Sequence, residues 1–131
     1  MKFRIYYEDT DAQGIVYHSN YLKFCERARS EALLSAKLNL DKSKYMVVAN
    51  LNAKFVRPAR YGDIVQVVGK TLEVGRASVV FRQEIFRLED IDGNKCDELL
   101  FSTDITIAYL QNGKPCKFEP ELIEFFKRFW A

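Results

Sequence analysis

The side chains best suited to chemistry lie together in one short segment, residues 6–21. It holds two aspartates, Asp9 and Asp11, one glycine, Gly14, the only histidine of the chain, His18, and several tyrosines. A carboxylate can take a proton from water or attack an acyl carbon. Backbone N–H groups at a helix start can stabilise the oxyanion that forms. The segment therefore suits acyl transfer.

Three other interpretations of parts of this segment stay open on the residues alone. The run from Asp9 to Gly14 imitates the first half of a calcium-binding EF-hand loop, but its twelfth position is Asn20, where a bidentate glutamate is required. The aspartates can instead serve only as turn and capping residues, as many loop aspartates do. A single histidine near a helix start, such as His18, is also commonly structural.

A strand and a helix are expected on either side of this segment. Lys2–Glu8 alternates between apolar and polar residues, which predicts a strand, and Asp9–Ser19 reads as a polar loop. Apolar residues then recur every three or four positions, which predicts a helix over Tyr21–Leu38. Ser19 or Asn20 is suited to cap its start.

The rest of the chain is rich in strand-forming residues and ends in a helix. Turn signals separate four predicted strands: Met46–Arg57, Asp63–Val74, Ala77–Leu88 and Glu98–Leu110. An amphipathic helix begins near Pro120. The aromatic cluster at this end of the chain is expected to be a packing face, with a membrane-surface helix as the alternative: Phe125, Phe126, Phe129 and Trp130. This order predicts an α+β fold, a curved antiparallel sheet wrapped around one long helix plus a short C-terminal helix. Such a sheet leaves an open edge suited to dimerisation.

Composition limits the possible classes of function. The 131 residues suffice for one domain, 1–131, and the net charge of +2 is too small to favour nucleic acid as a partner. No apolar run is long enough for a membrane span, and the first residues have no signal-peptide pattern. The odd cysteine count, with no CxxC spacing and one histidine, argues against a metal site. We expect a reduced, soluble, cytoplasmic protein.

Two stretches of the chain carry a family resemblance. The segment from Tyr6 to Glu31 contains an aspartate pair, a glycine, a tyrosine–histidine pair and the helix run Glu-Arg-Ala-Arg. It closely resembles the signature of the YbgC-like branch of the 4-hydroxybenzoyl-CoA thioesterase family. Phe55–Asp63 is similar to the same family's strand-to-turn segment, and the order of elements agrees over nearly the whole chain.

The resemblance implies a hotdog fold, hydrolysis of acyl-CoA thioesters, and active sites at the interface of a homodimer, often within a homotetramer. The family's catalytic aspartate falls on Asp11, the histidine of the YbgC branch on His18, and a pocket tyrosine on Tyr7. Gly14 and Tyr17, within the same signature, are assigned to substrate binding. The oxyanion donors are expected among the backbone N–H groups near Tyr17–Ser19. Asp11 is either a general base or a nucleophile, and no cofactor is expected because coenzyme A is part of the substrate.

The phosphates of coenzyme A need basic side chains at the rim of the site. Four candidates stand beside turns: Arg57, Arg60, Lys70 and Arg76. Charged residues along the predicted helix are expected to form ion pairs with one another: Glu26, Arg27, Arg29 and Glu31. Cys25 falls on the apolar stripe of that helix and is expected to behave as a small apolar residue.

Two competing functions remain at this point. One is a hydratase or dehydratase acting on acyl-CoA or acyl carrier protein, which would need a histidine and a carboxylate poised over the acyl β-carbon. The other is a module that binds an acyl chain or acyl carrier protein without turnover. The sequence leaves open the acyl chain length, the carrier, and the choice between dimer and tetramer.

Overall fold

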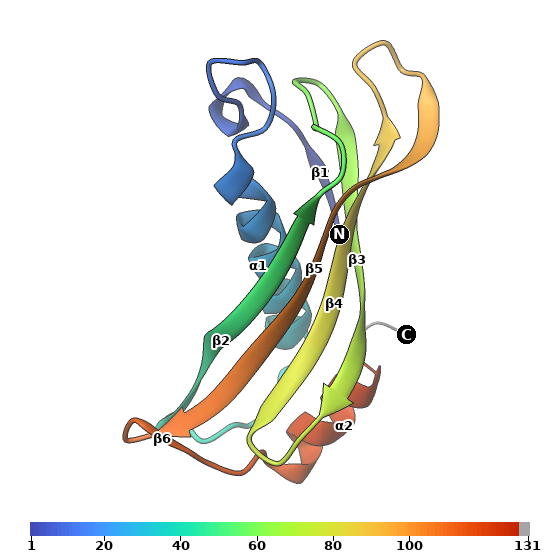
Figure 1. The fold of residues 1–131 in the computed structure, drawn as a ribbon. Helices are drawn as coiled ribbons and strands as arrows, with labels where there is room; N and C mark the ends of the chain where they lie inside the picture. Colours follow the sequence, from blue (N-terminus) through green and yellow to red (C-terminus); the bar gives the residue numbers. More distant parts are fainter. Residues whose placement is uncertain (129–131) are drawn as a thin grey trace.

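The computed structural model describes residues 1–128 and confirms the predicted α+β architecture (Figure 1). One short strand and a long helix precede most of the sheet, and a short helix follows it. The elements are β1 (Lys2–Arg4), the 3-10 turn η1 (Tyr7–Asp9), α1 (His18–Ser35), β2 (Lys44–Phe55), β3 (Ile64–Val74), β4 (Ser78–Glu89), β5 (Lys95–Gln111), β6 (Lys114–Pro115) and α2 (Pro120–Arg128).

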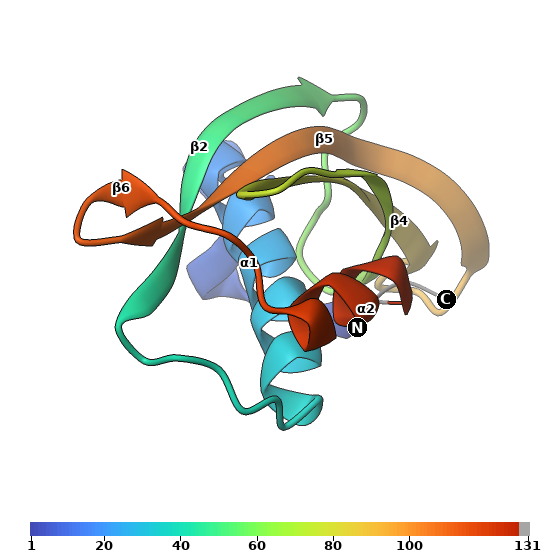
Figure 2. The ribbon, with the colours of Figure 1, turned by 90° about the horizontal axis from the view of Figure 1, so that it is seen from below.

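The strands form one antiparallel sheet in the order β1-β3-β4-β5-β2, with the short β6 added to β5. The sheet curves around α1, which Figure 2 shows most clearly along the axis of the fold. The helix packs over β3 and β4, and α2 contacts β3 at the end of the sheet farther from the start of α1. The outermost strand β2 therefore keeps a concave side that α1 does not cover.

Helix α1 has the expected buried stripe but different ends. Tyr21, Phe24, Cys25 and Ala28 are buried against the sheet, as the three- and four-residue spacing predicts. The helix begins at His18 rather than Tyr21, so the predicted capping role of Ser19 or Asn20 is wrong. It ends at Ser35 rather than Leu38.

Two local contacts explain these ends. The side-chain amide of Asn20 lies inside the first turn and donates to the carbonyl oxygen of Asp9 at 2.9 Å, which ties the helix to the preceding loop. At the other end, Lys37 adopts a left-handed φ of 54°, and this conformation stops the helix although apolar residues continue beyond it.

The first strand is shorter than its alternating pattern predicts. It ends at Arg4, and the chain then turns through η1. The carboxylate of Asp9 accepts a hydrogen bond from the backbone N–H of Tyr6 at 2.8 Å, and the N–H of Thr10 donates to the carbonyl of Tyr7 at 3.0 Å. These local bonds compete with the strand ladder, so the predicted strand through Glu8 is wrong beyond Arg4.

Strand β2 carries a bulge. Its pairing with β5 shifts register between Val48 and Asn50, so Ala49 is an extra residue on the β2 side. On its other side, β2 pairs with no strand among the described residues. The predicted open edge of the sheet is therefore confirmed, and it is bent.

The charged residues of α1 do not form the predicted ion pairs with one another within residues 1–128. Glu26 instead accepts a hydrogen bond from Ser30 at 2.9 Å, and Arg29 donates to Gln83 of β4 at 2.8 Å. Burial raises the pKa of the Cys25 thiol to about 12, so the thiol stays protonated and acts as an apolar group, as expected.

The C-terminal helix α2 buries Leu122 and Phe126 in a core cluster with residues that include Phe81, Tyr109 and Phe118. This supports the predicted packing face, although Phe129 and Trp130 lie outside the described residues. Within residues 1–128, no helix combines the length and the apolar character that a membrane span needs.

Candidate active site

The structure brings Asp11 and His18 into the wall of one cavity of about 380 Å³. The wall also contains Tyr21 from α1, Phe55 at the end of β2, and Arg57 just beyond it. Segments more than thirty residues apart in the sequence thus meet at the start of α1. This meeting point is the candidate active site.

Asp11 is held by a tight turn that leaves part of its carboxylate available. Its Oδ1 accepts the backbone N–H of Gln13 at 2.8 Å, and its carbonyl accepts the N–H of Gly14 at 3.0 Å. Gly14 has a φ of +79°, a left-handed conformation that favours glycine. Within residues 1–128, no hydrogen bond engages Oδ2 of Asp11. One carboxylate oxygen therefore orients the side chain and the other is left for a substrate or a water.

The start of α1 offers backbone donors beside this carboxylate, but fewer than expected. The N–H of Tyr17 donates to the carbonyl of Asp9 at 2.9 Å, so the loop itself already uses this donor. The N–H groups of His18 and Ser19 have no acceptor among the described residues. Of the donors expected near Tyr17–Ser19, the N–H groups of His18 and Ser19 therefore stay available, and that of Tyr17 does not.

An aromatic wall faces the histidine. The ring of His18 lies 4.4 Å from that of Tyr17 and 6.4 Å, edge-on, from that of Phe55 (centroid distances). Phe55 in turn contacts Tyr21 at 5.7 Å and Phe101 at 5.2 Å. The cavity thus has a polar side at Asp11 and an apolar side suited to an acyl group.

Tyr21 is a site residue that sequence reasoning missed, because the helical stripe explained it fully as core. Its phenolic oxygen accepts the buried backbone N–H of Ala59 at 2.9 Å. Burial raises the pKa of Tyr21, and the negative charge of Asp11 adds to this shift. The phenol therefore keeps its proton and presents a neutral hydroxyl at the cavity wall.

Arg87 of β4 holds the turn that carries Arg57 and Pro58 in place through hydrogen bonds and ion pairs. The Arg87 guanidinium contacts the Asp63 carboxylate at 2.8 Å and that of Glu98 at 3.2 Å, and it also donates to the carbonyl of Pro58. Asp63 accepts the N–H of Arg60 at 2.8 Å as well. This buried ion pair connects the turn to the middle of the sheet.

The same turn is tightly packed at Gly62, where φ is +86°. A Cβ placed there would lie only 2.6 Å from the side chain of Ile91. Both conformation and space thus require glycine at this position.

Several predicted site residues lie outside the cavity wall. Tyr7 is 74% exposed and stacks on Tyr61 with ring centroids 4.1 Å apart. Gly14 and Tyr17 shape the loop around Asp11 without lining the cavity. Arg60 bridges to Ile15 through its backbone.

Among the basic residues proposed for phosphate contact, only Arg57 lines the cavity. Its guanidinium is largely exposed and lies 3.8 Å from Glu98. Lys70 is exposed along β3, and Arg76 lies in the turn between β3 and β4, at the end of the fold opposite the start of α1 (Figure 1).

The calcium-loop interpretation gains no support. Asp9 and Asp11 each have a carboxylate oxygen that accepts a hydrogen bond from a backbone N–H of their own loop. The part of the chain that the structure describes contains no cluster of three histidine, cysteine or acidic side chains able to hold a metal ion.

Comparisons with known proteins agree with this geometry. A family model of the thioesterase superfamily matches residues 13–93. The acyl-CoA thioesterase YbgC of Helicobacter pylori is 40% identical over 91 residues, 69% of this chain and 68% of that protein. The acyl-CoA thioester hydrolase YbgC of Escherichia coli is 34% identical over 105 residues, 77% of this chain and 78% of that protein.

A solved structure extends the likeness to the whole fold. The crystal structure of a hypothetical protein from Aquifex aeolicus has a TM-score of 0.84 and 28% identity, and covers 97% of this chain and 98% of that one. With the sheet wrapped around α1, these matches confirm the predicted hotdog fold. The chain belongs to the thioesterase superfamily, and within it to the YbgC-like thioesterases.

Proposed function

We propose that this protein hydrolyses acyl-CoA thioesters to a free acid and coenzyme A in the cavity lined by Asp11 and His18. One observation carries the proposal: a carboxylate with an unengaged oxygen stands beside unengaged backbone N–H groups at the start of α1. Thioester hydrolysis needs both, one to activate water and one to stabilise the oxyanion.

In the general-base route, Asp11 takes a proton from a water molecule as the water oxygen attacks the carbonyl carbon. The carbonyl electrons move onto oxygen, where the N–H groups of His18 and Ser19 donate to the oxyanion. The carbonyl then re-forms, the C–S bond breaks, and the proton passes from Asp11 to the departing thiolate. In the nucleophilic route, Asp11 attacks the carbonyl carbon itself, the C–S bond breaks, and coenzyme A leaves as the thiolate. Water then hydrolyses the mixed anhydride, which releases the acid, restores the Asp11 carboxylate and supplies the proton that the thiolate takes up. Neither route needs a cofactor.

The neighbouring side chains have supporting roles in this proposal. The His18 ring orients the thioester or hydrogen-bonds to the carboxylate, and Phe55 packs against the acyl group beside it. Arg57, exposed at the cavity rim, is the first choice for contact with the coenzyme A phosphates. Arg60 follows in the same turn, and Tyr7, Gly14 and Tyr17 act through the shape of the loop.

We further propose that the working form is a homodimer, or a homotetramer of such dimers, acting in the cytoplasm in lipid metabolism. The unpaired edge of β2 supports this assembly, because an exposed strand edge is completed most simply by the same edge of a second copy. Acyl carrier protein is a possible alternative carrier of the acyl group, since it presents the same thioester.

The test is thiol release from a panel of acyl-CoAs by the wild type and by Asp11→Asn. The amide can neither accept the proton nor attack, so we expect turnover to fall about 10²- to 10⁴-fold with an unchanged circular dichroism spectrum. Asp92→Asn, an exposed aspartate in the loop between β4 and β5, is the matched control and should keep wild-type turnover.

Full turnover by Asp11→Asn would rule this mechanism out. If the wild type releases thiol from acyl carrier protein thioesters and not from any acyl-CoA, coenzyme A is not the carrier. The proposal of thioester hydrolysis is then kept.

A further inference from the structure

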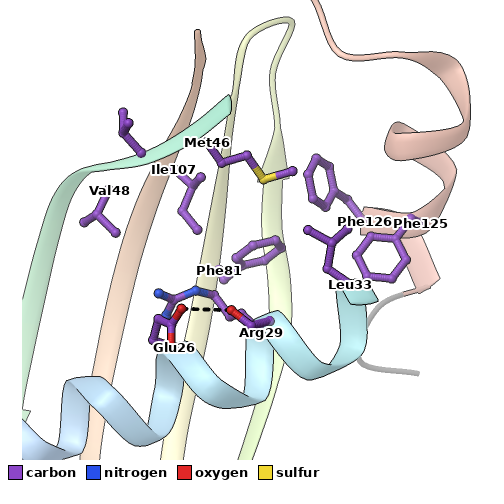
Figure 3. Close-up of a pocket in the computed structure, with 11 residues that line it drawn as sticks. Glu26, Arg29, Leu33, Met46, Val48, Phe81, Ile107, Phe125 and Phe126 are labelled. Carbon is purple, nitrogen blue, oxygen red and sulfur yellow. Dashed lines mark hydrogen bonds between the residues drawn. The ribbon is translucent and has the colours of Figure 1, made fainter. Parts of the chain in front are cut away.

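A second cavity, of about 230 Å³, lies farther along α1, beyond the candidate active site (Figure 3). Strands β2, β4 and β5 wall it on one side and the two helices on the other. Figure 3 shows side chains from the strands pointing toward α1 across this space. Its apolar walls include Leu33, Met46, Val48, Phe81, Ile107 and Phe126.

The two cavities lie along one apolar strip on the uncovered concave side of β2. Residues directly opposite each other in an antiparallel pair point to the same face. Phe55, Leu51 and Val48 stand opposite Phe101, Ile105 and Ile107 of β5, which are all buried on the concave side. The three β2 side chains face the same way but remain exposed, because α1 packs over β3 and β4 instead. The strip starts at the wall of the active-site cavity and ends at the wall of the second one.

Three polar side chains line the second cavity, Glu26, Arg29 and Ser30, and each makes a hydrogen bond to a neighbour. Arg29 donates at 2.8 Å to Gln83, which is fully buried and in turn donates to the carbonyl of Cys25 at 3.0 Å. The Ser30 hydroxyl donates to Glu26 at 2.9 Å. The remaining surface is aliphatic and aromatic, which suits a hydrocarbon chain.

We propose that the second cavity receives the distal end of the acyl chain and makes the enzyme select chains of about ten carbons or more. This rests on the proposed thioester hydrolysis at Asp11. Eight residues separate Tyr21, at the active-site cavity, from Arg29, at the second, which is about 12 Å along the helix. An extended alkyl chain with bonds of about 1.5 Å advances about 1.25 Å per carbon. Shorter chains therefore end before the second cavity, and longer ones enter it.

Chain length should then control the rate in a defined way. Each methylene that becomes buried raises kcat/KM by about fourfold. We expect kcat/KM of the wild type to increase from butyryl-CoA through octanoyl-CoA to lauroyl-CoA.

The proposal can be tested with a variant whose larger side chain fills the second cavity. Val48→Trp places an indole at its wall, whereas Val68→Trp makes the same change at an exposed position of β3; the two valines are 50% and 36% exposed. We expect the ratio of kcat/KM for lauroyl-CoA to that for butyryl-CoA to fall at least tenfold in Val48→Trp and to stay within twofold of wild type in Val68→Trp. Val48→Phe is the fallback if thermal melting shows Val48→Trp to be unfolded.

A ratio within twofold of wild type in all folded variants would overturn the proposal, as would a wild type that hydrolyses butyryl-CoA faster than lauroyl-CoA. Calorimetric titration with lauric acid separates this proposal from the proposed function, because it needs no turnover. Binding at least tenfold weaker in Val48→Trp than in Val68→Trp supports the distal acyl site even if no acyl-CoA is hydrolysed. Equal binding by both variants contradicts it.

Discussion

Tyr21 both stabilises the fold, through its hydroxyl, and lines the active-site cavity. Its oxygen accepts the N–H of Ala59, a residue that is almost completely buried, and its ring stacks on Phe101 and contacts Phe55. Without this acceptor, the Ala59 N–H would be buried with no partner, and buried unpaired donors are costly. Through Tyr21, helix α1 therefore fixes the position of the aromatic side of the cavity and the position of the chain just beyond Pro58.

Tyr21→Phe tests this double role. We expect the free energy of unfolding to fall by about 1–3 kcal/mol, because the Ala59 N–H loses its acceptor in a buried place. Chemical denaturation followed by circular dichroism measures the change. Tyr45→Phe is the matched control, since the Tyr45 oxygen also accepts a backbone N–H, that of Gly113, but at an exposed site where water can replace it. A similar loss in both variants would contradict the interpretation.

The parts of the site that are close in sequence were predictable, and the parts that depend on tertiary packing were not. Asp11 and His18 are seven residues apart in one polar segment, and the family resemblance of that segment singled them out without any structure. Phe55 and Tyr21 read as ordinary apolar positions of a strand and a helix, and only the curvature of the sheet brings their rings together. Tyr7 lies in the turn η1 rather than in the predicted strand, because the Asp9 carboxylate accepts the N–H of Tyr6 and this local bond overrides the alternating pattern.

The turn between β2 and β3 depends on one ion pair to stay beside the active site. The side chains of Arg87 and Asp63 are only 12% and 4% exposed, so their charges are held largely away from water. If one partner is removed, the other stays buried and uncompensated, which costs far more than the loss of an exposed pair. The position of Arg57 at the cavity rim follows from this pairing.

Arg87→Met measures that dependence against a control on the same strand. We expect the variant to lose about 3–5 kcal/mol of stability, because the buried Asp63 carboxylate is left without its partner. Arg82→Met removes an arginine that pairs with Asp104 at 2.8 and 3.0 Å, but these side chains are 40% exposed, so we expect a loss below about 1 kcal/mol. Denaturant midpoints of the two variants give the comparison, and equal losses would show that burial is not the deciding factor.

The molecule has two sheet edges, and they are not equivalent. Part of β3 is paired with β1, and farther along the Thr71 hydroxyl of β3 donates to the carbonyl of Phe126 in α2 at 2.7 Å. Within residues 1–128, the outer edge of β2 has neither a paired strand nor a hydrogen bond to a helix. Assembly through β2 would also place a second copy beside the strip that connects the two cavities.

Charge at this edge should break the dimer. Asn50→Lys combined with Asn52→Lys would set like charges against one another across a pair of β2 strands, and like charges on paired strands repel. We expect light scattering after gel filtration to give two or four times the 15.3 kDa chain mass for the wild type and half of the wild-type mass, or less, for the double variant. Glu73→Lys, which changes a charge on β3, should keep the wild-type mass. A wild-type monomer would contradict assembly through β2.

The extra residue at Ala49 has a consequence for aggregation. A flat, regular edge strand accepts almost any extended chain, which is how fibrillar assemblies grow. The bulge between Val48 and Asn50 bends β2 and interrupts the even spacing of its donors and acceptors. A second copy related by two-fold symmetry carries the same bend, whereas a straight foreign strand does not. The bend thus restricts which chains can be added to this edge and protects the free molecule from open-ended growth.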